Sequence, residues 1–366
     1  MSISPAVESS LPLIEQSSND LSGASTNEKK VKEGFRIKKA VRVAFIVLAS
    51  TFGAVALGAA VATIITAAVV NPITPAIICA TVALTSFVAL TSLGALKAWE
   101  KITPHLPKFL RIPANYIQST VCALISSVAL GVIWPIDYTK KNVKPEDVDP
   151  TQPLIIGSHG FLGSGNNWMY MFGRLKEAGH KNLASINYGN AFVSIDTYAD
   201  KMHNLIKGYT ENPELKAKLN GKKLKVQFLC HSMGGLVARH YKQKYPNDNV
   251  DVEDIITLGT PLDGTHMSNL ALGVSKAARE MNHNSKFIKN QQKNAELDSD
   301  TNYYHIASKC DFVIRPLVSA TLGKGPKTKV DWLDGTGHVS YLWSDTAGDL
   351  IVNYLKNRSG ELASAA

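Results

Sequence analysis

The chain has 366 residues, of which 45% are hydrophobic, and a formal net charge of +9 at pH 7. This length allows a membrane-associated region together with one large globular domain that buries a full core. Much of the basic excess flanks apolar segments and does not interleave with aromatic side chains, which argues against nucleic-acid binding. The four cysteines form no framework that requires a disulfide, which suits a reducing compartment.

Residues 1–40 are predicted to be a polar and basic tail. Residues 1–28 are rich in Ser, Asn and Pro, lack a hydrophobic period and are expected to be disordered. About 40 residues precede the first apolar run, whereas a secretory signal places its short apolar core near the N-terminus. The tail is therefore not interpreted as a cleavable signal.

Residues 41–137 are predicted to be a hydrophobic, membrane-associated region. No charged residue or histidine lies between Val43 and Leu96, and prolines 72 and 75 interrupt this run once. Segments 43–70 and 76–96 are each long enough to cross a hydrocarbon core of about 30 Å, so a membrane hairpin is expected. Segment 114–136 is also uncharged but contains more polar residues. Its sequence leaves open whether it spans, lies at the interface or packs on the following domain.

Charge predicts the orientation of this hairpin. Both flanks are basic, through residues 29, 30, 32, 36, 38, 39 and 42 on one side and 97, 101, 108 and 111 on the other. Positive residues stay on the cytosolic side, so the N-terminus and both hairpin ends are predicted to be cytosolic in a multi-pass membrane protein. A third span would place the following domain on the opposite side. The paired apolar lobes of residues 40–97 resemble the bilobed segment of chlamydial inclusion-membrane proteins, which would imply a secreted protein in a host membrane.

The sequence FLCHSMGG at residues 228–235 is the strongest chemical motif. A short apolar strand runs into His231 and Ser232, and a helical pattern begins at Leu236. This strand–turn–helix context is typical of a nucleophile elbow, in which the turn presents a serine hydroxyl at the end of a sheet. Gly234 and Gly235 allow the close backbone approach that such a turn needs. Cys230 stands where the G-x-S-x-G pattern has its first glycine.

The residues that would activate Ser232 follow it in the chain. Asp311 comes after a predicted strand at 302–308, and His338 lies in the glycine-rich sequence GTGHVS before a predicted helix. The order Ser, Asp, His is that of α/β-hydrolase triads. Asp331 and Asp334 remain alternatives for the carboxylate. His159, His231 and His266 are weaker alternatives for the base; we expect His159 to hold its own loop and His231 to point away from the site.

As a set, these landmarks resemble the bacterial lipase branch of the α/β-hydrolases. The set comprises HGFLG, CHSMGGLVAR, ITLGTPLDGT, the aspartate after a strand and GTGHVSYL, and it covers about residues 150–357. The resemblance implies that Ser232 is the nucleophile, His338 the base and Asp311 the residue that orients it. It also implies that the backbone N–H groups of Phe161 and Met233 form the oxyanion hole, and that the reaction is hydrolysis of carboxylic esters, often of lipids.

Alternating patterns predict an α/β domain over residues 138–366, and the resemblance implies that this domain has the α/β-hydrolase fold. Strands are expected at 153–158, 182–187, 224–230, 253–258 and 302–308, and helices near 167–178, 194–208, 234–245 and 344–356. Such alternation favours a mostly parallel sheet covered by helices on both faces. Residues 265–298 mix apolar side chains with many Asn and Lys, fit poorly as core and are predicted to form a small lid.

The sequence therefore predicts a membrane-anchored serine hydrolase that cleaves carboxylic esters, with lipid or acyl esters as substrates. No cofactor is expected. No His/Cys cluster has zinc-ligand spacing, and GSGNNW at 163–168 lacks the phosphate-binding glycine patterns. Two alternatives stay open: an acyltransferase or thioesterase that uses the same triad, and an inactive membrane interaction protein with a hydrolase fold. The oligomeric state is not indicated.

Overall fold

The domain is built on a parallel sheet of six strands in the order β2-β1-β3-β4-β5-β6. The computed structural model describes residues 138–365 except 247–248, 272–274, 297 and 323–326. The strands are β1 (Leu154–Ser158), β2 (Leu183–Ser185), β3 (Leu224–His231), β4 (Val250–Leu258), β5 (Asn302–Ser308) and β6 (Thr328–Leu333). Because all the pairings are parallel, the carboxyl ends of the strands share one edge.

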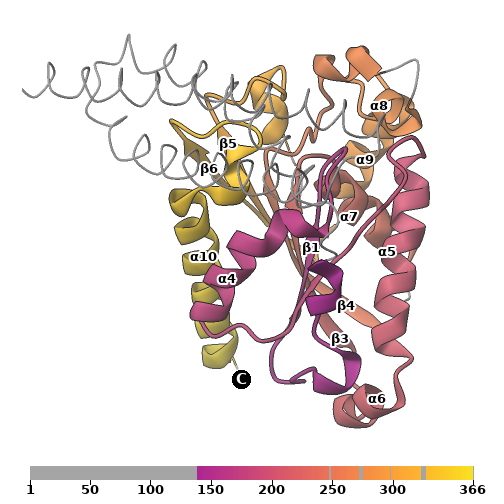
Figure 1. The fold of residues 1–366 in the computed structure, drawn as a ribbon, viewed down its shortest axis with the longest axis vertical. Helices are drawn as coiled ribbons and strands as arrows, with labels where there is room; N and C mark the ends of the chain where they lie inside the picture. The colour runs from indigo at the N-terminus through magenta and orange to yellow at the C-terminus, as the bar shows by residue number, and fades with distance from the viewer. Residues whose placement is uncertain (1–137, 247–248, 272–274, 297, 323–326, 366) are drawn as a thin grey trace, which may run out of the picture.

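Helices cover both faces of this sheet (Figure 1). One face carries α4 (Met169–Glu177) and α10 (Asp345–Ala365); the other carries α5 (Ile195–Thr210), α7 (Met233–Lys244) and α9 (Lys286–Glu296). The short helices α6 (Pro213–Leu219) and α8 (Lys276–Glu280) lie at opposite ends of the domain in this view.

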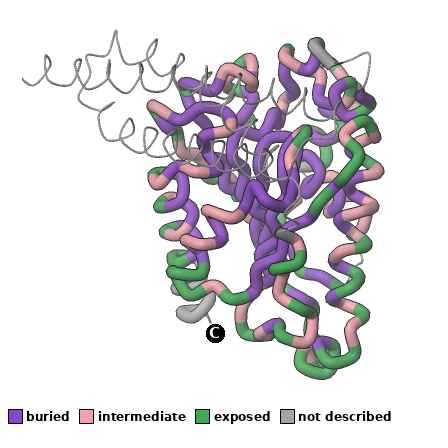
Figure 2. The backbone as a smooth tube through the Cα atoms, in the orientation of Figure 1, coloured by how far each residue is buried: buried purple, intermediate pink, exposed green. Residues whose placement is uncertain are grey.

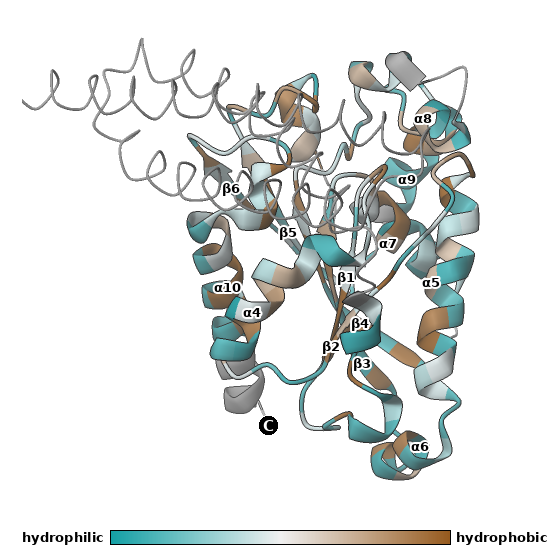
Figure 3. Ribbon diagram, in the orientation of Figure 1, coloured by the Kyte–Doolittle hydropathy of each residue, from teal (hydrophilic) through white to brown (hydrophobic). Residues whose placement is uncertain are grey.

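Strand side chains alternate between two hydrophobic clusters, as the pleat requires. Leu154 and Ile156 of β1 belong to the cluster under α5 and α7, whereas Ile155 belongs to the cluster under α4 and α10. All five β1 residues are buried, because both faces of a parallel sheet are covered. Figure 2 shows the buried sheet at the centre, and Figure 3 shows the polar outer faces of the helices.

The five expected strands are present with boundaries close to those expected, but a sixth was missed. β6 has the sequence TKVDWL, and only Leu333 among its residues is buried. This strand lies at the edge of the sheet and leaves most of its side chains partly or fully exposed, so it lacks the apolar run that predicted the central strands.

Residues 265–298 contribute more to the core than their composition indicated. Ala277, Ala278 and Ile288 are buried, and α9 packs on α7 as the crossover helix between β4 and β5. Its Asn and Lys residues include exposed positions on an amphipathic helix. The expectation that this whole segment fits poorly as core was therefore wrong, since one apolar helix face suffices to bury it.

The predicted tail 1–40 and the hydrophobic region 41–137, with its spans 43–70 and 76–96 and its third segment 114–136, lie outside the described residues. Within the described part of the chain, no helix is long and apolar enough to cross a membrane.

Candidate active site

Ser232 occupies a strained turn between β3 and α7. β3 ends at His231, α7 begins at Met233, and Ser232 between them has φ 54° and ψ −127°. A residue other than glycine rarely adopts a positive φ, and such backbone strain is often found at functional positions. The turn presents the Ser232 hydroxyl at the carboxyl edge of the sheet, as the strand–turn–helix pattern predicted.

The two glycines after Ser232 are required by close backbone packing. A Cβ atom on Gly234 would lie 2.2 Å from the carbonyl oxygen of Ser158, and one on Gly235 would lie 2.3 Å from Oγ1 of Thr260. The start of α7 therefore presses against the ends of β1 and β4. Cys230, at the position of the first motif glycine, is fully buried in the α5/α7 hydrophobic cluster, so this site accommodates a small side chain.

The structure brings Ser232, His338 and Asp311 together in one chain of hydrogen bonds. The distance from His338 Nε2 to Ser232 Oγ is 2.9 Å, and the distance from His338 Nδ1 to Asp311 Oδ2 is 2.8 Å. A carboxylate only accepts, so Nδ1 carries the proton and Nε2 accepts from the serine hydroxyl. The imidazole is thereby oriented to take the Ser232 proton.

Asp311 is held by its own turn. Its other carboxylate oxygen, Oδ1, accepts the backbone N–H groups of Val313 at 2.9 Å and Ile314 at 3.0 Å. The alternative carboxylates lie elsewhere: Asp331 accepts the Tyr304 hydroxyl, and Asp334 pairs with Lys309. Among the three aspartates considered from the sequence, Asp311 is the one that bonds to His338.

Gly259, directly after β4, packs against this pair and was not singled out from the sequence. It has φ +55°, and a Cβ there would lie 2.8 Å from Asp311 Oδ2, 3.3 Å from His338 Nδ1 and 2.7 Å from the Tyr341 ring. The signal was present in the sequence ITLGTPLDG, where a glycine follows an apolar strand directly.

The turn after β1 lies against Ser232. A Cβ on Gly160 would be 2.8 Å from the Ser232 Cβ, and the turn closes through the hydrogen bond from Gly163 N to Gly160 O. Met233 is the first residue of α7, so its N–H has no intrahelical acceptor. The backbone hydrogen bonds of the described turns include none donated by Phe161. The assignment of the Phe161 and Met233 N–H groups to an oxyanion hole stays a prediction.

His159 holds this turn and does not reach Ser232. Its Nδ1 donates to the Gly160 carbonyl at 2.8 Å, and its Nε2 accepts the Tyr188 N–H at 3.1 Å. Complete burial lowers the pKa of His159 to about 4, so the ring is neutral at pH 7. A second buried bond, 2.7 Å between the Ser158 and Tyr188 hydroxyls, joins the ends of β1 and β2 below it.

His231 points into the site, contrary to expectation. Its Nε2 donates to the His338 carbonyl at 2.7 Å, and the two imidazole rings lie 4.9 Å apart. Its Nδ1 faces the oxyanion turn, 3.1 Å from the position of a Cβ on Gly160. Burial lowers the pKa of His231 to about 3, which keeps it neutral. His231 therefore bonds to the loop of the predicted base and packs against the predicted oxyanion turn, and only the tertiary structure reveals this position.

His266, the remaining alternative base, is exposed at the start of the 3-10 helix η5 (His266–Ala271), with its ring 5.4 Å from that of His283. Within the described residues, no group of three or more His, Cys, Asp or Glu side chains could hold a metal ion.

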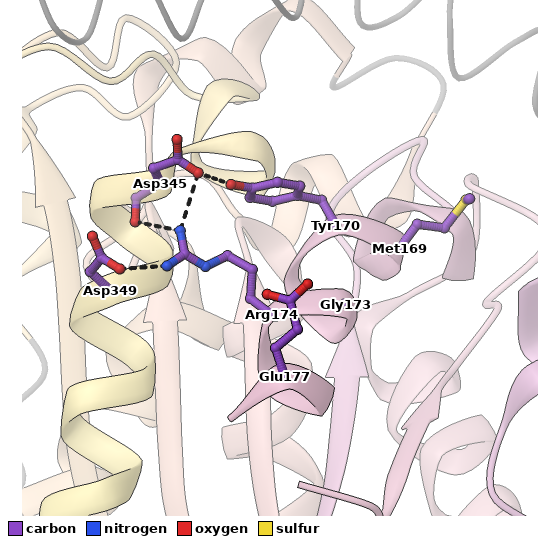
Figure 4. A pocket seen from close by; sticks show the side chains of 7 residues that line it. All are labelled: Met169, Tyr170, Gly173, Arg174, Glu177, Asp345 and Asp349. Carbon is purple, nitrogen blue, oxygen red and sulfur yellow. Dashed lines mark hydrogen bonds and ion pairs between the residues drawn. The ribbon is translucent and has the colours of Figure 1, made fainter. Parts of the chain in front are cut away.

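A separate surface pocket lies between α4 and α10 (Figure 4). Arg174 crosses it, bonding to Asp345 at 3.1 Å and to Asp349, while Tyr170 donates to Asp345. The lining contains none of the residues around Ser232. These ion pairs join the two helices, and we assign the pocket no chemistry.

The family model of palmitoyl protein thioesterase matches residues 153–313, a range that includes Ser232 and Asp311 and ends before His338. A search of the curated proteins found no match.

Several solved structures are similar at low sequence identity. Lipase B of Aspergillus fumigatus is 13% identical, with 82% of this chain and 84% of that chain covered and a TM-score of 0.49. A carboxylesterase structure from the thaumarchaeon Nitrososphaera gargenis is 14% identical (58% and 93% covered, TM-score 0.40). The type II thioesterase BorB of the borrelidin biosynthetic cluster is 16% identical (57% and 92% covered, TM-score 0.40). With its parallel sheet, its serine turn after β3 and the family-model match over residues 153–313, the described domain has the α/β-hydrolase fold.

Proposed function

We propose that the protein is a membrane-anchored serine hydrolase that cleaves carboxylic esters through an acyl-enzyme on Ser232. The observation that carries the proposal is the pair of hydrogen bonds from Ser232 to His338 and from His338 to Asp311, at 2.9 and 2.8 Å. Proximity alone can be structural, but here the serine also has the strained backbone of a nucleophile turn.

The proposed reaction has two steps. His338 Nε2 takes the proton as Ser232 Oγ bonds to the acyl carbon, and the N–H groups of Phe161 and Met233 stabilise the oxyanion. The intermediate then collapses, the bond to the leaving group breaks, and that group receives the proton from His338. Water, deprotonated by the same imidazole, attacks the acyl-enzyme, the bond between the acyl carbon and Ser232 Oγ breaks, His338 returns the proton to that oxygen, and the acid is released. Asp311 stabilises the imidazolium in both steps.

Labelling with a fluorophosphonate tests this proposal directly. The full-length protein, reconstituted in vesicles, should be labelled in the wild type and in Ser340→Ala, but not in Ser232→Ala. Ser340 is a suitable control because it is also buried and lies two residues after His338. Unchanged labelling of Ser232→Ala, or no labelling of the folded wild type, would contradict the proposal.

The substrate class follows from the predicted membrane attachment and is a lipid or long-chain acyl ester. The uncharged segments 43–70 and 76–96 would hold the domain at a bilayer. Hydrolysis of long-chain p-nitrophenyl esters in vesicles should exceed hydrolysis of the acetate by at least about tenfold in kcat/KM, as burial of several methylenes predicts. Equal values would contradict a lipid-ester specificity.

A long-chain thioester is the second candidate substrate, favoured by the match to the palmitoyl protein thioesterase model. The proposed steps are unchanged except that a thiolate leaves in place of an alkoxide. Competition between a palmitoylated cysteine peptide and a palmitate ester, both presented on the same vesicles, would rank the two. Adding alcohol acceptors to the same reaction would reveal acyl transfer through the appearance of new esters.

The lid proposal narrows to η5, because α8 is tied to the loop after β2 by the hydrogen bonds from Lys276 N and Ala277 N to the carbonyls of Phe192 and Val193. Helix α9 is tied down, since Gln292 Nε2 donates to the Leu262 carbonyl and Arg239 donates to that of Gln291. By contrast, residues 266–271 lie in the connection that follows the carboxyl end of β4. We expect a Gly-Ser replacement of residues 267–271 to change the preferred acyl length, and an unchanged preference would exclude this segment as a lid.

A further inference from the structure

Exposed apolar side chains gather at one edge of the sheet. The large hydrophobic residues that are exposed among those described are Leu162, Phe192, Val318, Leu322 and Trp332, with exposed fractions of 38–63%. Leu162 follows β1, Phe192 follows β2, Val318 and Leu322 follow β5, and Trp332 is the penultimate residue of β6. All five therefore belong to the carboxyl edge, which also presents Ser232. We call these five residues the apolar rim.

Hydrogen bonds join the loops that carry the rim into one surface. The Phe192 carbonyl accepts from Lys276 N of α8 at 3.2 Å. The hydroxyl of Ser319, next to Val318, donates to the Gly264 carbonyl at the end of the β4 loop. Leu162 is held outward by a left-handed backbone, with φ 59°. Apolar side chains held exposed around a site mark a surface that binds another apolar surface.

The opposite edge of the sheet has the reverse character. The turn from α6 into β3 exposes Lys216, Lys218, Lys222 and Lys223, together with Glu214. None of the described large hydrophobic residues that are exposed belongs to this edge. The domain is therefore polarised, with a hydrophilic end at the amino edge of the sheet and an apolar end at its carboxyl edge.

The chain enters the domain on the side of the apolar end. Val143 N donates to the Leu183 carbonyl, and the Asn142 amide bonds to the backbone of Ser185, the last residue of β2. The entering segment thus runs antiparallel to β2, which places Tyr138 beyond the carboxyl end of that strand. Residues 112–136, immediately before it, contain no charged side chain.

We propose that the apolar rim docks on the lipid surface of the membrane that holds the uncharged N-terminal segments, so that Ser232 faces the bilayer. The occupant is a lipid surface because the uncharged segment 112–136, which lies outside the described residues, ends two residues before Tyr138. Tyr138 is where the described chain begins, at this same edge. Exposed Lys276 beside Phe192 fits such a surface, since a lysine can extend its ammonium to anionic headgroups. This orientation rests on the proposed membrane anchoring and is independent of whether Ser232 reacts.

Depth-dependent fluorescence quenching tests the orientation. Cysteine is introduced into the full-length chain at Phe192 or Val318, or at Lys222 as the matched position on the opposite edge, after Cys79 and Cys122 are replaced by serine. The labelled protein is reconstituted in phosphatidylcholine–phosphatidylglycerol vesicles that contain doxyl-labelled lipid. We expect at least threefold stronger quenching at the two rim positions than at Lys222.

Each outcome decides the proposal. Equal quenching at both edges, or rim labels that lipid does not quench, would overturn it. Energy transfer between rim labels on different copies, without lipid quenching, would show that a second copy of the chain covers the rim instead. A chain that does not float with the vesicles would overturn the anchoring as well, whereas fluorophosphonate labelling of Ser232 would be unaffected by any of these results.

A functional variant completes the test. Val318→Asp should lower kcat/KM on a vesicle-embedded ester by about tenfold and leave hydrolysis of soluble p-nitrophenyl acetate within twofold, since Val318 is exposed and is not one of the residues proposed to react. Lys222→Asp should change neither rate. Equal losses on both substrates would indicate damage to the fold and contradict the docking role.

Discussion

Replacement of Gly259 by alanine should disable the site without removing any group that reacts. Gly259 follows β4 directly, has φ +55° and lies against the pair formed by Asp311 and His338. An alanine Cβ would approach Asp311 Oδ2 to 2.8 Å and the Tyr341 ring to 2.7 Å. Contacts this short do not persist, so the carboxylate and the ring must move apart or the strand must shift.

Two terms set the expected size of the effect. The left-handed backbone costs about 1–2 kcal/mol for a residue with a Cβ, and overpacking a filled site adds about 1–3 kcal/mol. The free energy of unfolding should therefore fall by roughly 2–5 kcal/mol. A displacement of about 1 Å in a catalytic arrangement lowers activity by roughly 10²-fold, which is the loss in kcat/KM that we expect from the shifted Asp311.

Gly173→Ala is the matched control, because it makes the same chemical change in α4 where a new Cβ meets nothing within 4 Å. This control should keep full activity and gain about 0.5–1 kcal/mol of stability. Urea unfolding and hydrolysis of a soluble p-nitrophenyl ester measure both quantities. If folded Gly259→Ala retained activity within twofold of the wild type, the packing argument for Asp311 and His338 would be refuted.

Three further predictions concern the carboxylate, the buried histidine beside the serine and the effect of pH. Asp311→Asn should lower kcat roughly 10⁴-fold by favouring the wrong imidazole tautomer, whereas Asp331→Asn should retain activity within a few-fold; similar losses would leave the carboxylate unassigned. His231→Leu should lower kcat about tenfold, the worth of one hydrogen bond, with KM unchanged, and His231→Gln should restore most of it; no rescue would indicate a purely structural role. Burial lowers the pKa of His159 to about 4 and that of His305 to about 3. As the pH falls, these histidines are therefore protonated in the unfolded state before they are protonated in the folded state. Each should lower the free energy of unfolding by about 1.4 kcal/mol per pH unit between pH 6.5 and 4. Urea titrations across that range should show a smaller slope for His305→Asn, and an identical slope would refute this assignment.

The sequence was informative about the sheet because central strands carry a strong signal. β1, β3 and β5 are buried on both faces and appear as apolar runs, so their positions could be predicted closely. β6 has only one buried residue, so its sequence lacks the apolar run that marks the central strands.

The candidate site likewise contains residues that the sequence could identify and residues that only the structure could assign. Ser232 was identifiable because its turn is a local event, with the strand, the serine and the glycines adjacent in the chain. The sequence favoured Asp311, which follows a predicted strand, but left Asp331 and Asp334 as alternatives, since all three precede His338 in the last quarter of the domain. The choice depends on which carboxylate the end of β5 brings within 2.8 Å of the imidazole.

The sequence by itself determined the elements and groups whose physics is local: the uncharged segments long enough to cross a bilayer, the alternation that makes a parallel sheet, and the turn that presents Ser232. Only the tertiary structure decided which side chains meet across more than a hundred residues. His231 bonds to the loop of His338, Gly259 makes room for the carboxylate, and the exposed apolar residues share one edge. The reason is geometric: parallel strands bring their carboxyl ends together, and residues far apart in the chain become neighbours only when the strand order is set.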